Sequence, residues 1–226
     1  WKPSATRPGN TALRKFSDIN KSGPMQDRTS GVEPSEATSD PRQSHLPDFY
    51  LTIILIFTTM DQPQLDALRH SCAHLLAKAV KTLCPGAHNA IGPSIENGFY
   101  QDFDMGDYKI TDADFQKIEA KMREILPNWK KFSFDEVSAA EARELFKDNP
   151  YKLELIEEFA AGGKKITTNN PGDFLDLCKM GHAENPSKEL KNFKLLSIAG
   201  AYWRGDEKNK MLTRIYGTCF PSKEEL

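Results

Sequence analysis

The sequence predicts an α+β fold in which helices pack on a mixed or antiparallel sheet. Several segments place apolar residues at helical spacing, and others alternate between apolar and polar residues as strands do. The two kinds of segment follow one another without the regular βαβ order of a doubly wound sheet. With 226 residues, the chain can form one or two domains with a sizeable core.

The first 59 residues differ in composition from the rest of the chain. Residues 1–48 are rich in Ser, Thr, Pro and Gly and carry no apolar period, so we expect disorder. The apolar segment 51–58 is far shorter than the ~20 residues of a membrane-spanning helix, and it lies too far from the N-terminus for a signal peptide. It is interpreted either as an added strand or as translated sequence upstream of a start at Met60. We therefore expect a disordered or spurious extension over 1–59 and a domain over 60–226.

A long helix is the first patterned element of that domain. It is predicted to begin near Gln64 and to end at the Cys84-Pro85-Gly86 segment, which breaks a helix. Its apolar stripe consists of Leu65, Leu68, Cys72, Leu75, Leu76, Ala79 and Leu83.

Short strands with a tight turn are expected over 89–104, where Gly and Pro interrupt apolar residues. Thr111 is expected to cap a second helix, which extends to Ile125. Ser138 and Glu141 form a capping box that opens a third helix. The remaining predicted elements are a helix over 151–159 and strands over 130–137, 164–168, 193–198 and 211–217.

Charge and cysteine content limit the functional classes. Thirty basic and 32 acidic residues give a net charge of −2, so any binding of nucleic acid must come from a local patch, and no membrane partner is indicated. Four cysteines are too few for a disulfide framework, which favours a reducing compartment, and we expect the cytoplasm. Cys84 and Cys219 are expected to be structural.

Two short motifs carry groups that can do chemistry. His70 and His74 are four residues apart, which places both rings on one side of the first helix, ~40° apart. That side is opposite the Leu stripe and also carries Lys78 and Lys81, so a solvated face is the alternative interpretation. Cys178 and His182 repeat the four-residue separation about a hundred residues later.

The chemistry of these four side chains leaves two readings open. Three imidazoles and a thiolate form a ligand set for tetrahedral zinc. The same groups can position and activate a water without metal, because His and Cys exchange protons near neutral pH. Asp176 is placed to orient an imidazole or to bind a substrate amine. A buried structural thiol is the alternative for Cys178.

Longer motifs carry a resemblance to a known family. The segments "LRHSCAHLLAKAV", "AIGPSIENGFYQDFD", "YKLELIEE", "GDFLDLCKMGH" and "FKLLSIAGAYWRGDEKNKMLTRIYGTCF" resemble the editing domain of bacterial threonyl-tRNA synthetase. The last segment is similar to the second additional domain shared by the threonyl and alanyl enzymes, which we place at about 173–220. The resemblance runs from about Leu68 to the C-terminus and implies the α+β fold of that editing domain.

The resemblance implies a pocket lined by His70, His74, Lys152, Asp176, Cys178 and His182. Two positions depart from the family pattern. Lys179-Met180-Gly181 stands where the family usually has Arg-Gly-Pro, and Gln101 stands where it often has a second Tyr. A changed loop could shift His182, so the first departure puts activity in question.

The implied function is hydrolysis of the ester in seryl-tRNA(Thr), with the acceptor end of tRNA(Thr) as partner and no cofactor required. The resemblance favours a metal-free site over Zn²⁺ bound by His70, His74, Cys178 and His182. The adenylate-forming core is not in this sequence, so no ligase activity is expected from this chain alone. A capping box at Ser222 and Glu225 suggests the front part of a longer protein, and a full-length synthetase would be a homodimer. The alternative function is a non-catalytic module that binds zinc or tRNA.

Basic and aromatic residues are densest near the C-terminus. Phosphate contacts and base stacking suit this mixture, although the aromatic residues Tyr202, Trp203 and Tyr216 could equally belong to the core. The residues expected to contact tRNA are Lys194, Arg204, Lys208, Lys210 and Arg214, with Lys191 beside them.

Overall fold

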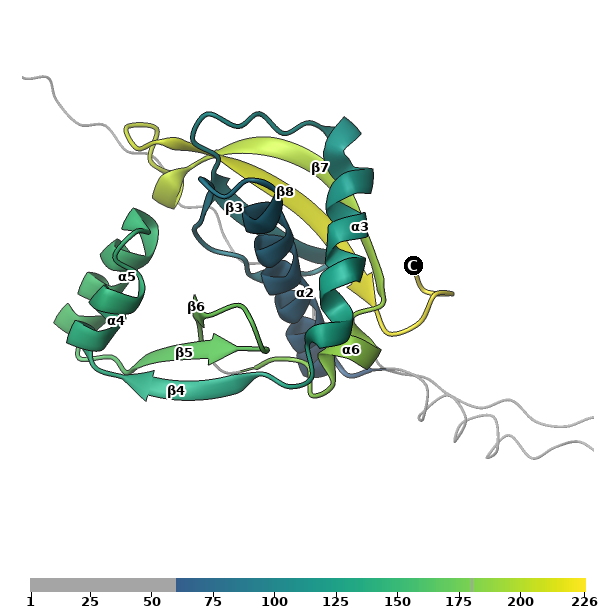
Figure 1. The fold of residues 1–226 in the computed structure, drawn as a ribbon, viewed down its shortest axis with the longest axis horizontal. Helices are drawn as coiled ribbons and strands as arrows, with labels where there is room; N and C mark the ends of the chain where they lie inside the picture. Colours follow the sequence, from purple (N-terminus) through teal and green to yellow (C-terminus); the bar gives the residue numbers. More distant parts are fainter. Residues whose placement is uncertain (1–59, 180) are drawn as a thin grey trace, which may run out of the picture. The chain divides into compact units, whose positions relative to one another are not determined.

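The computed structural model describes residues 60–179 and 181–226, and the predictions for residues 1–59 lie outside this part of the chain. The described residues form two antiparallel sheets with helices packed against them, which confirms the predicted α+β class (Figure 1). Within these ranges no helix combines the length and the apolar composition needed to cross a membrane.

Helix α2 (Gln62–Leu83) is the central element. The side chain of Asp61 accepts a hydrogen bond from the backbone N–H of Gln64, and the Gln64 side chain accepts one from the backbone N–H of Asp61. This capping box starts the helix two residues before the predicted position. Its apolar stripe is buried as predicted at Leu68, Cys72 and Leu75.

The larger sheet has the strand order β1-β3-β8-β7, with β2 paired to the N-terminal end of β3. Helices α2 and α3 (Phe115–Ile125) lie side by side and pack against this sheet (Figure 1). The strands are β1 (His88–Asn89), β2 (Ser94–Ile95), β3 (Gly98–Asp104), β7 (Asn192–Tyr202) and β8 (Met211–Phe220).

The smaller sheet has the order β4-β5-β6 and carries the helical pair α4–α5. Ser138 and Glu141 form the predicted capping box at the start of α4, and Asn149 caps α5 through its side-chain oxygen. The elements are β4 (Ser133–Val137), α4 (Ala139–Leu145), α5 (Pro150–Ala161), β5 (Ile166–Asn170) and β6 (Asp176–Leu177).

Short elements account for most differences from the predicted order. Strand β6 and helix α6 (Pro186–Glu189) were not predicted, because two and four residues are too few to establish an apolar period. Strand β5 begins at Ile166 rather than at residue 164. The second predicted helix is split, since a 3₁₀ turn (Asp112–Asp114) precedes α3.

The main core fills the space between α2, α3 and the larger sheet, with Phe99, Phe103 and Trp129 fully buried. A smaller core lies between the α4–α5 pair and the smaller sheet. Residues 176–178 run between these two cores and lie against α2, where its histidines point.

Candidate functional site

Helix α2 supplies the two histidines predicted to share one face. The His74 side chain is buried, with 4% of the residue exposed, and His70 is half-buried. The solvated-face interpretation is therefore wrong. The segment that follows β5 covers this side of the helix, and Asp173 there pairs with Lys78 at 3.0 Å.

Strand β6 and the residue after it supply the other half of the site. Asp176 and Leu177 pair with β5, and the ladder continues through the backbone N–H of Cys178, which donates to the Thr167 carbonyl at 3.1 Å. The Thr167 hydroxyl donates to the Cys178 carbonyl at 2.6 Å. Both backbone groups of Cys178 are thus held by β5, which fixes where its side chain begins.

The two predicted motifs meet at the sulfur of Cys178. Its Sγ lies 3.2 Å from His70 Nε2, 3.3 Å from His74 Nε2 and 3.5 Å from His182 Nε2. The three imidazole rings stack at an angle to one another, with centroids 4.6–5.1 Å apart. The departure at residues 179–181 does not separate His182 from the cluster.

Asp176 connects this cluster to Lys152. One carboxylate oxygen, Oδ1, lies 2.7 Å from Lys152 Nζ and accepts the backbone N–H of Leu177 at 2.9 Å. The other, Oδ2, lies 3.1 Å from His74 Nδ1 and accepts a hydrogen bond from Asn89 Nδ2 at 3.0 Å. The His74 contact is best described as an ion pair, because His74 Nδ1 makes no hydrogen bond of good geometry.

The charges of the network follow from these contacts. Burial raises the pKa of the Cys178 thiol, but hydrogen bonds from His182, His70 and His74 outweigh burial and lower the pKa to about 4. Burial lowers the pKa of His74, whereas Asp176 and Cys178 raise it to about 9. Burial raises the pKa of Asp176. Lys152 and His74 outweigh this effect and hold the pKa of Asp176 well below its usual range. At neutral pH the site therefore holds a thiolate–imidazolium pair beside a carboxylate–ammonium pair.

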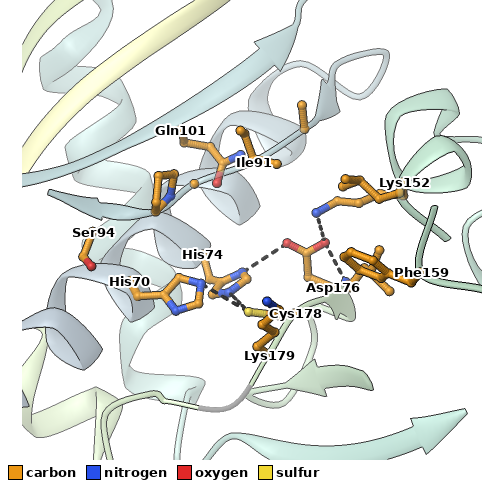
Figure 2. A pocket seen from close by; sticks show the side chains of 15 residues that line it. His70, His74, Ile91, Ser94, Gln101, Lys152, Phe159, Asp176, Cys178 and Lys179 are labelled. Atoms are coloured by element: carbon orange, nitrogen blue, oxygen red, sulfur yellow. Dashed lines mark hydrogen bonds and ion pairs between the residues drawn. The ribbon is translucent and has the colours of Figure 1, made fainter. Parts of the chain in front are cut away.

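These groups form one side of a pocket of about 450 Å³ (Figure 2). Figure 2 shows Gln101 and Ile91 across the pocket from Cys178 and Lys179, with Lys152 and Phe159 at one end. The His70, His74 and Cys178 side chains line this pocket, whereas His182 lines separate surface grooves. A pocket of this size admits a small polar molecule or the end of a larger one.

The four clustered residues also fit a metal ion by their chemistry. Their donor atoms all lie within 4.8 Å of one another. The sulfur-to-nitrogen distances of 3.2–3.5 Å are near the ~3.6 Å that separates sulfur and nitrogen ligands of tetrahedral zinc. Two neighbours oppose this occupancy. Asn169 Nδ2 lies 3.0 Å from His182 Nε2, the nitrogen that would have to bind the metal, and the buried Lys152 cation pairs with the neighbouring Asp176.

The residues expected to contact tRNA are not gathered in one place. Three of them form ion pairs within the protein: Arg204 with Glu154 and Glu158, Lys210 with Asp104, and Arg214 with Asp102. The other two, Lys194 and Lys208, lie at opposite ends of the β7–β8 hairpin. Trp203 is buried and donates to Glu154 at 2.8 Å, which places this aromatic residue in the core.

Three polar residues of the site were not predicted as members. Asn89 contacts Asp176, Asn169 contacts His182, and Gln101 was noted only as a departure from the family. Asn89 and Asn169 lie within strands and are almost fully buried. An amide side chain inside a strand pattern is the signal that could have found them, because a buried amide needs a partner.

A comparison with known protein families first identifies the class of domain. Residues 169–216 match the family described as "Threonyl and Alanyl tRNA synthetase second additional domain". This range contains Asn169, Asp176, Cys178 and His182, so half of the site lies within the matched segment.

Similarity over about three quarters of the chain identifies the relatives more closely. The chain is 48% identical over 174 residues to the threonine–tRNA ligase of Thermotoga neapolitana, covering 75% of this chain and 27% of that protein. It is 49% identical over 177 residues to the ligase of Thermotoga maritima, covering 76% and 27%, and 46% identical over 173 residues to that of Flavobacterium psychrophilum, covering 76% and 26%. The chain is thus related to an editing-domain region of threonyl-tRNA synthetases, which confirms the resemblance carried by the motifs. The chain spans about a quarter of the length of these curated relatives.

Proposed function

We propose that this region hydrolyses the ester between serine and the acceptor end of tRNA(Thr). The observation that carries the proposal is the convergence of three histidines on the sulfur of Cys178, beside the Lys152–Asp176 pair. Of these residues, all but His182 line the open pocket. The relationship to threonine–tRNA ligases supports the choice of tRNA as substrate carrier.

The need for such a reaction follows from the similarity of threonine and serine. A site that accepts threonine rejects serine weakly, because one missing methyl group is worth only ~1–3 kcal/mol. Both amino acids present the same hydroxyl. A second site that hydrolyses the seryl ester supplies the remaining accuracy, and its pocket has to exclude the extra methyl group of threonine.

The residues divide the work of ester hydrolysis as follows. The cluster of imidazoles and the Cys178 thiolate positions a water and accepts its proton. His74 already holds its proton at neutral pH, so the acceptor is another member of the cluster and His74 stabilises the thiolate. Lys152 stabilises the developing oxyanion or the leaving ribose oxygen. Asp176 holds His74 with Nδ1 toward the carboxylate and Nε2 toward the sulfur. Because both Asp176 oxygens already have two protein partners, we assign it this orienting role rather than the binding of a substrate ammonium.

Partners and location follow from the same proposal. The acceptor end of tRNA(Thr) enters the pocket, with Lys179 at the rim and the exposed Lys194 and Lys208 on the β7–β8 hairpin available to phosphates. Such a domain works in the cytoplasm, where tRNA is charged, and within a full-length synthetase it belongs to a homodimer.

A deacylation assay tests the proposal. Seryl-tRNA(Thr) and threonyl-tRNA(Thr) are incubated with the purified protein, and release of the amino acid is followed. Rapid release of serine with threonine largely retained is the expected result. Equal release of both amino acids contradicts the second-site argument, and release of neither contradicts the proposed function.

The second candidate is a non-catalytic zinc module, which the ligand geometry favours. Zinc held by all four side chains has no open position for a water, because structural zinc sites have four protein ligands whereas catalytic sites keep one position free. Full four-ligand occupancy and hydrolysis at this cluster therefore exclude each other. Stoichiometric zinc in an inactive protein would establish this second candidate.

A further inference from the structure

Gln101 is a buried amide in a row of core phenylalanines. On β3, the side chains of Phe99, Gln101 and Phe103 point to the same face of the sheet, toward α2. The two phenylalanines belong to the main core, and Gln101 lines the pocket with only 2% of its surface exposed. Burial of an amide costs free energy unless its polar atoms have partners, so its place in this row requires a reason.

Gly92 provides the space for this side chain. A Cβ atom at position 92 would lie 2.0 Å from Gln101 Oε1 and 2.8 Å from its Cδ, so only glycine lets the carboxamide lie there. The backbone around Gly92 is fixed to β3, because Asp102 N donates to Ile91 O at 2.9 Å and Tyr100 N donates to Pro93 O at 3.3 Å. The carboxamide therefore lies against a rigid support.

The two ends of the carboxamide differ in their partners. Gln101 Nε2 donates to the Asp102 carbonyl at 3.3 Å, which turns Oε1 toward the pocket. Across residues 60–179 and 181–226, Oε1 has no hydrogen-bond donor within reach. The side chains nearest to it on this wall, Ile91 and Pro93, are apolar, and the hydroxyl-bearing Ser94 lies further along, toward His70 (Figure 2). An acceptor without a partner on an apolar wall is suited to a donor carried by the ligand.

We propose that Gln101 is the residue that recognises the amino-acid side chain of the substrate, accepting a hydrogen bond from the β-hydroxyl of serine while its fixed carboxamide leaves no room for a β-methyl group. This inference rests on the proposed function. The reacting carbonyl has to lie at the Cys178 cluster, so the amino-acid side chain is directed to another wall. A neutral carboxamide matches a neutral hydroxyl, whereas an ammonium is better matched by a carboxylate.

Two substitutions separate hydrogen bonding from size. Gln101→Met keeps the length of the side chain and removes the acceptor, and Gln101→Ala removes both. The substrates are tRNA(Thr) charged with serine, threonine or alanine, compared by kcat/KM. With Gln101→Met, the preference for serine over alanine falls by about 10-fold or more while threonine remains a poor substrate. With Gln101→Ala, threonyl-tRNA also becomes a substrate and the serine-to-threonine ratio falls by a similar factor.

A substitution at Gly92 tests the coupling of the two positions. Gly92→Ala pushes the carboxamide into the pocket and lowers kcat/KM for serine, and the same change made in the Gln101→Ala protein has little further effect, because its steric partner is gone. Two independent, additive effects contradict the proposal. So do serine-to-alanine and serine-to-threonine ratios that stay within twofold of wild type in both Gln101 variants.

A binding measurement separates this inference from the proposed function. The probe is adenosine that carries serine or alanine through a non-hydrolysable 3′-amide, titrated by calorimetry, with thermal melting as a check on folding. Wild type binds the seryl compound more tightly, and Gln101→Met binds the two alike. If wild type binds with this preference but hydrolyses no ester, the proposed function fails and the recognition by Gln101 stands. Equal binding of the two compounds by wild type overturns the inference, whatever the hydrolysis assay gives.

Discussion

Lys152 Nζ lies 2.7 Å from Asp176 Oδ1, and each side chain is about 5% exposed or less. A pair buried to this degree is costly to break, because removing one partner leaves an uncompensated charge in the interior. This relationship allows a test of the site that needs no substrate.

Asp176→Asn should lower the free energy of unfolding by ~3–5 kcal/mol, because Lys152 then keeps its charge without a carboxylate. Urea unfolding measures the change. The matched control is Glu136→Gln, which removes an exposed partner of Lys165 at the same 2.7 Å distance and should have little effect. Equal losses in both variants would contradict the importance of burial.

The effect of Asp176 on stability should depend on pH. Its pKa is depressed in the folded protein, so its contribution is present above the unfolded value of ~3.9 and is lost as pH falls toward the lower folded value. The difference in unfolding free energy between wild type and Asp176→Asn should therefore be constant from pH 5 to 6 and shrink below pH ~4. A difference that grows as pH falls would show that the carboxylate is not the ionised partner.

Cys178 should react as a thiolate at unusually low pH. Its pKa of about 4 predicts alkylation by iodoacetamide at a nearly constant rate between pH 5 and 8, whereas an ordinary thiol loses reactivity tenfold per unit below its pKa. His74→Gln removes one of the three neighbours that stabilise the thiolate and should move the midpoint upward. Mass spectrometry locates the label, and Cys178→Ala is the control because the other three cysteines are buried.

Catalysis should depend on the histidines of the cluster and not on a histidine elsewhere in the domain. His74→Ala removes the imidazolium that holds the Cys178 thiolate, so proton transfer by the cluster should be impaired. The rate of seryl-tRNA(Thr) deacylation should fall by up to ~10²–10⁴-fold, the usual contribution of positioned proton transfer. His88→Ala is the matched control, since His88 lies on β1 outside the cluster. A similar loss in both proteins would indicate a general defect of folding.

Metal content distinguishes the two candidate functions. We expect substoichiometric zinc in protein purified without affinity-column metal or chelator, because Asn169 and Lys152 oppose a cation at the cluster. Elemental analysis together with the deacylation assay gives the answer. Stoichiometric zinc that is lost along with activity in Cys178→Ala would falsify the metal-free mechanism and leave the residues of the pocket as assigned.

The predictable part of this fold lies in its long periodic segments. Helix α2 buries Leu68, Leu75 and Leu76 on one side, and its capping residues mark its start. Strand β6 could not be predicted, because its two residues form a strand only through pairing with β5. This short strand brings Asp176 to His74. The spacing of residues in the sequence could therefore place the two histidines on one face of the helix, but it could not identify the segment that covers that face.

The site shows the same division. Spacing aligned His70 with His74, while the membership of Lys152 rested on the family resemblance. Asn169 and Asn89 were missed because an asparagine in sequence indicates a turn as readily as a buried partner. Their roles depend on contacts with residues 13 and 87 positions away, which no local pattern contains.

His74 and Cys178 touch although 104 positions separate them in the chain. During synthesis at ~5–20 residues per second, the histidine is added to the chain ~5–20 s before its cysteine partner. In that interval α2 can pack its leucine side against α3 and β3, while its histidine side stays in water. Strands β7 and β8, which complete the larger sheet and the main core, follow Cys178 in the chain. All the residues of the cluster are therefore present in the nascent chain before the main core can be completed.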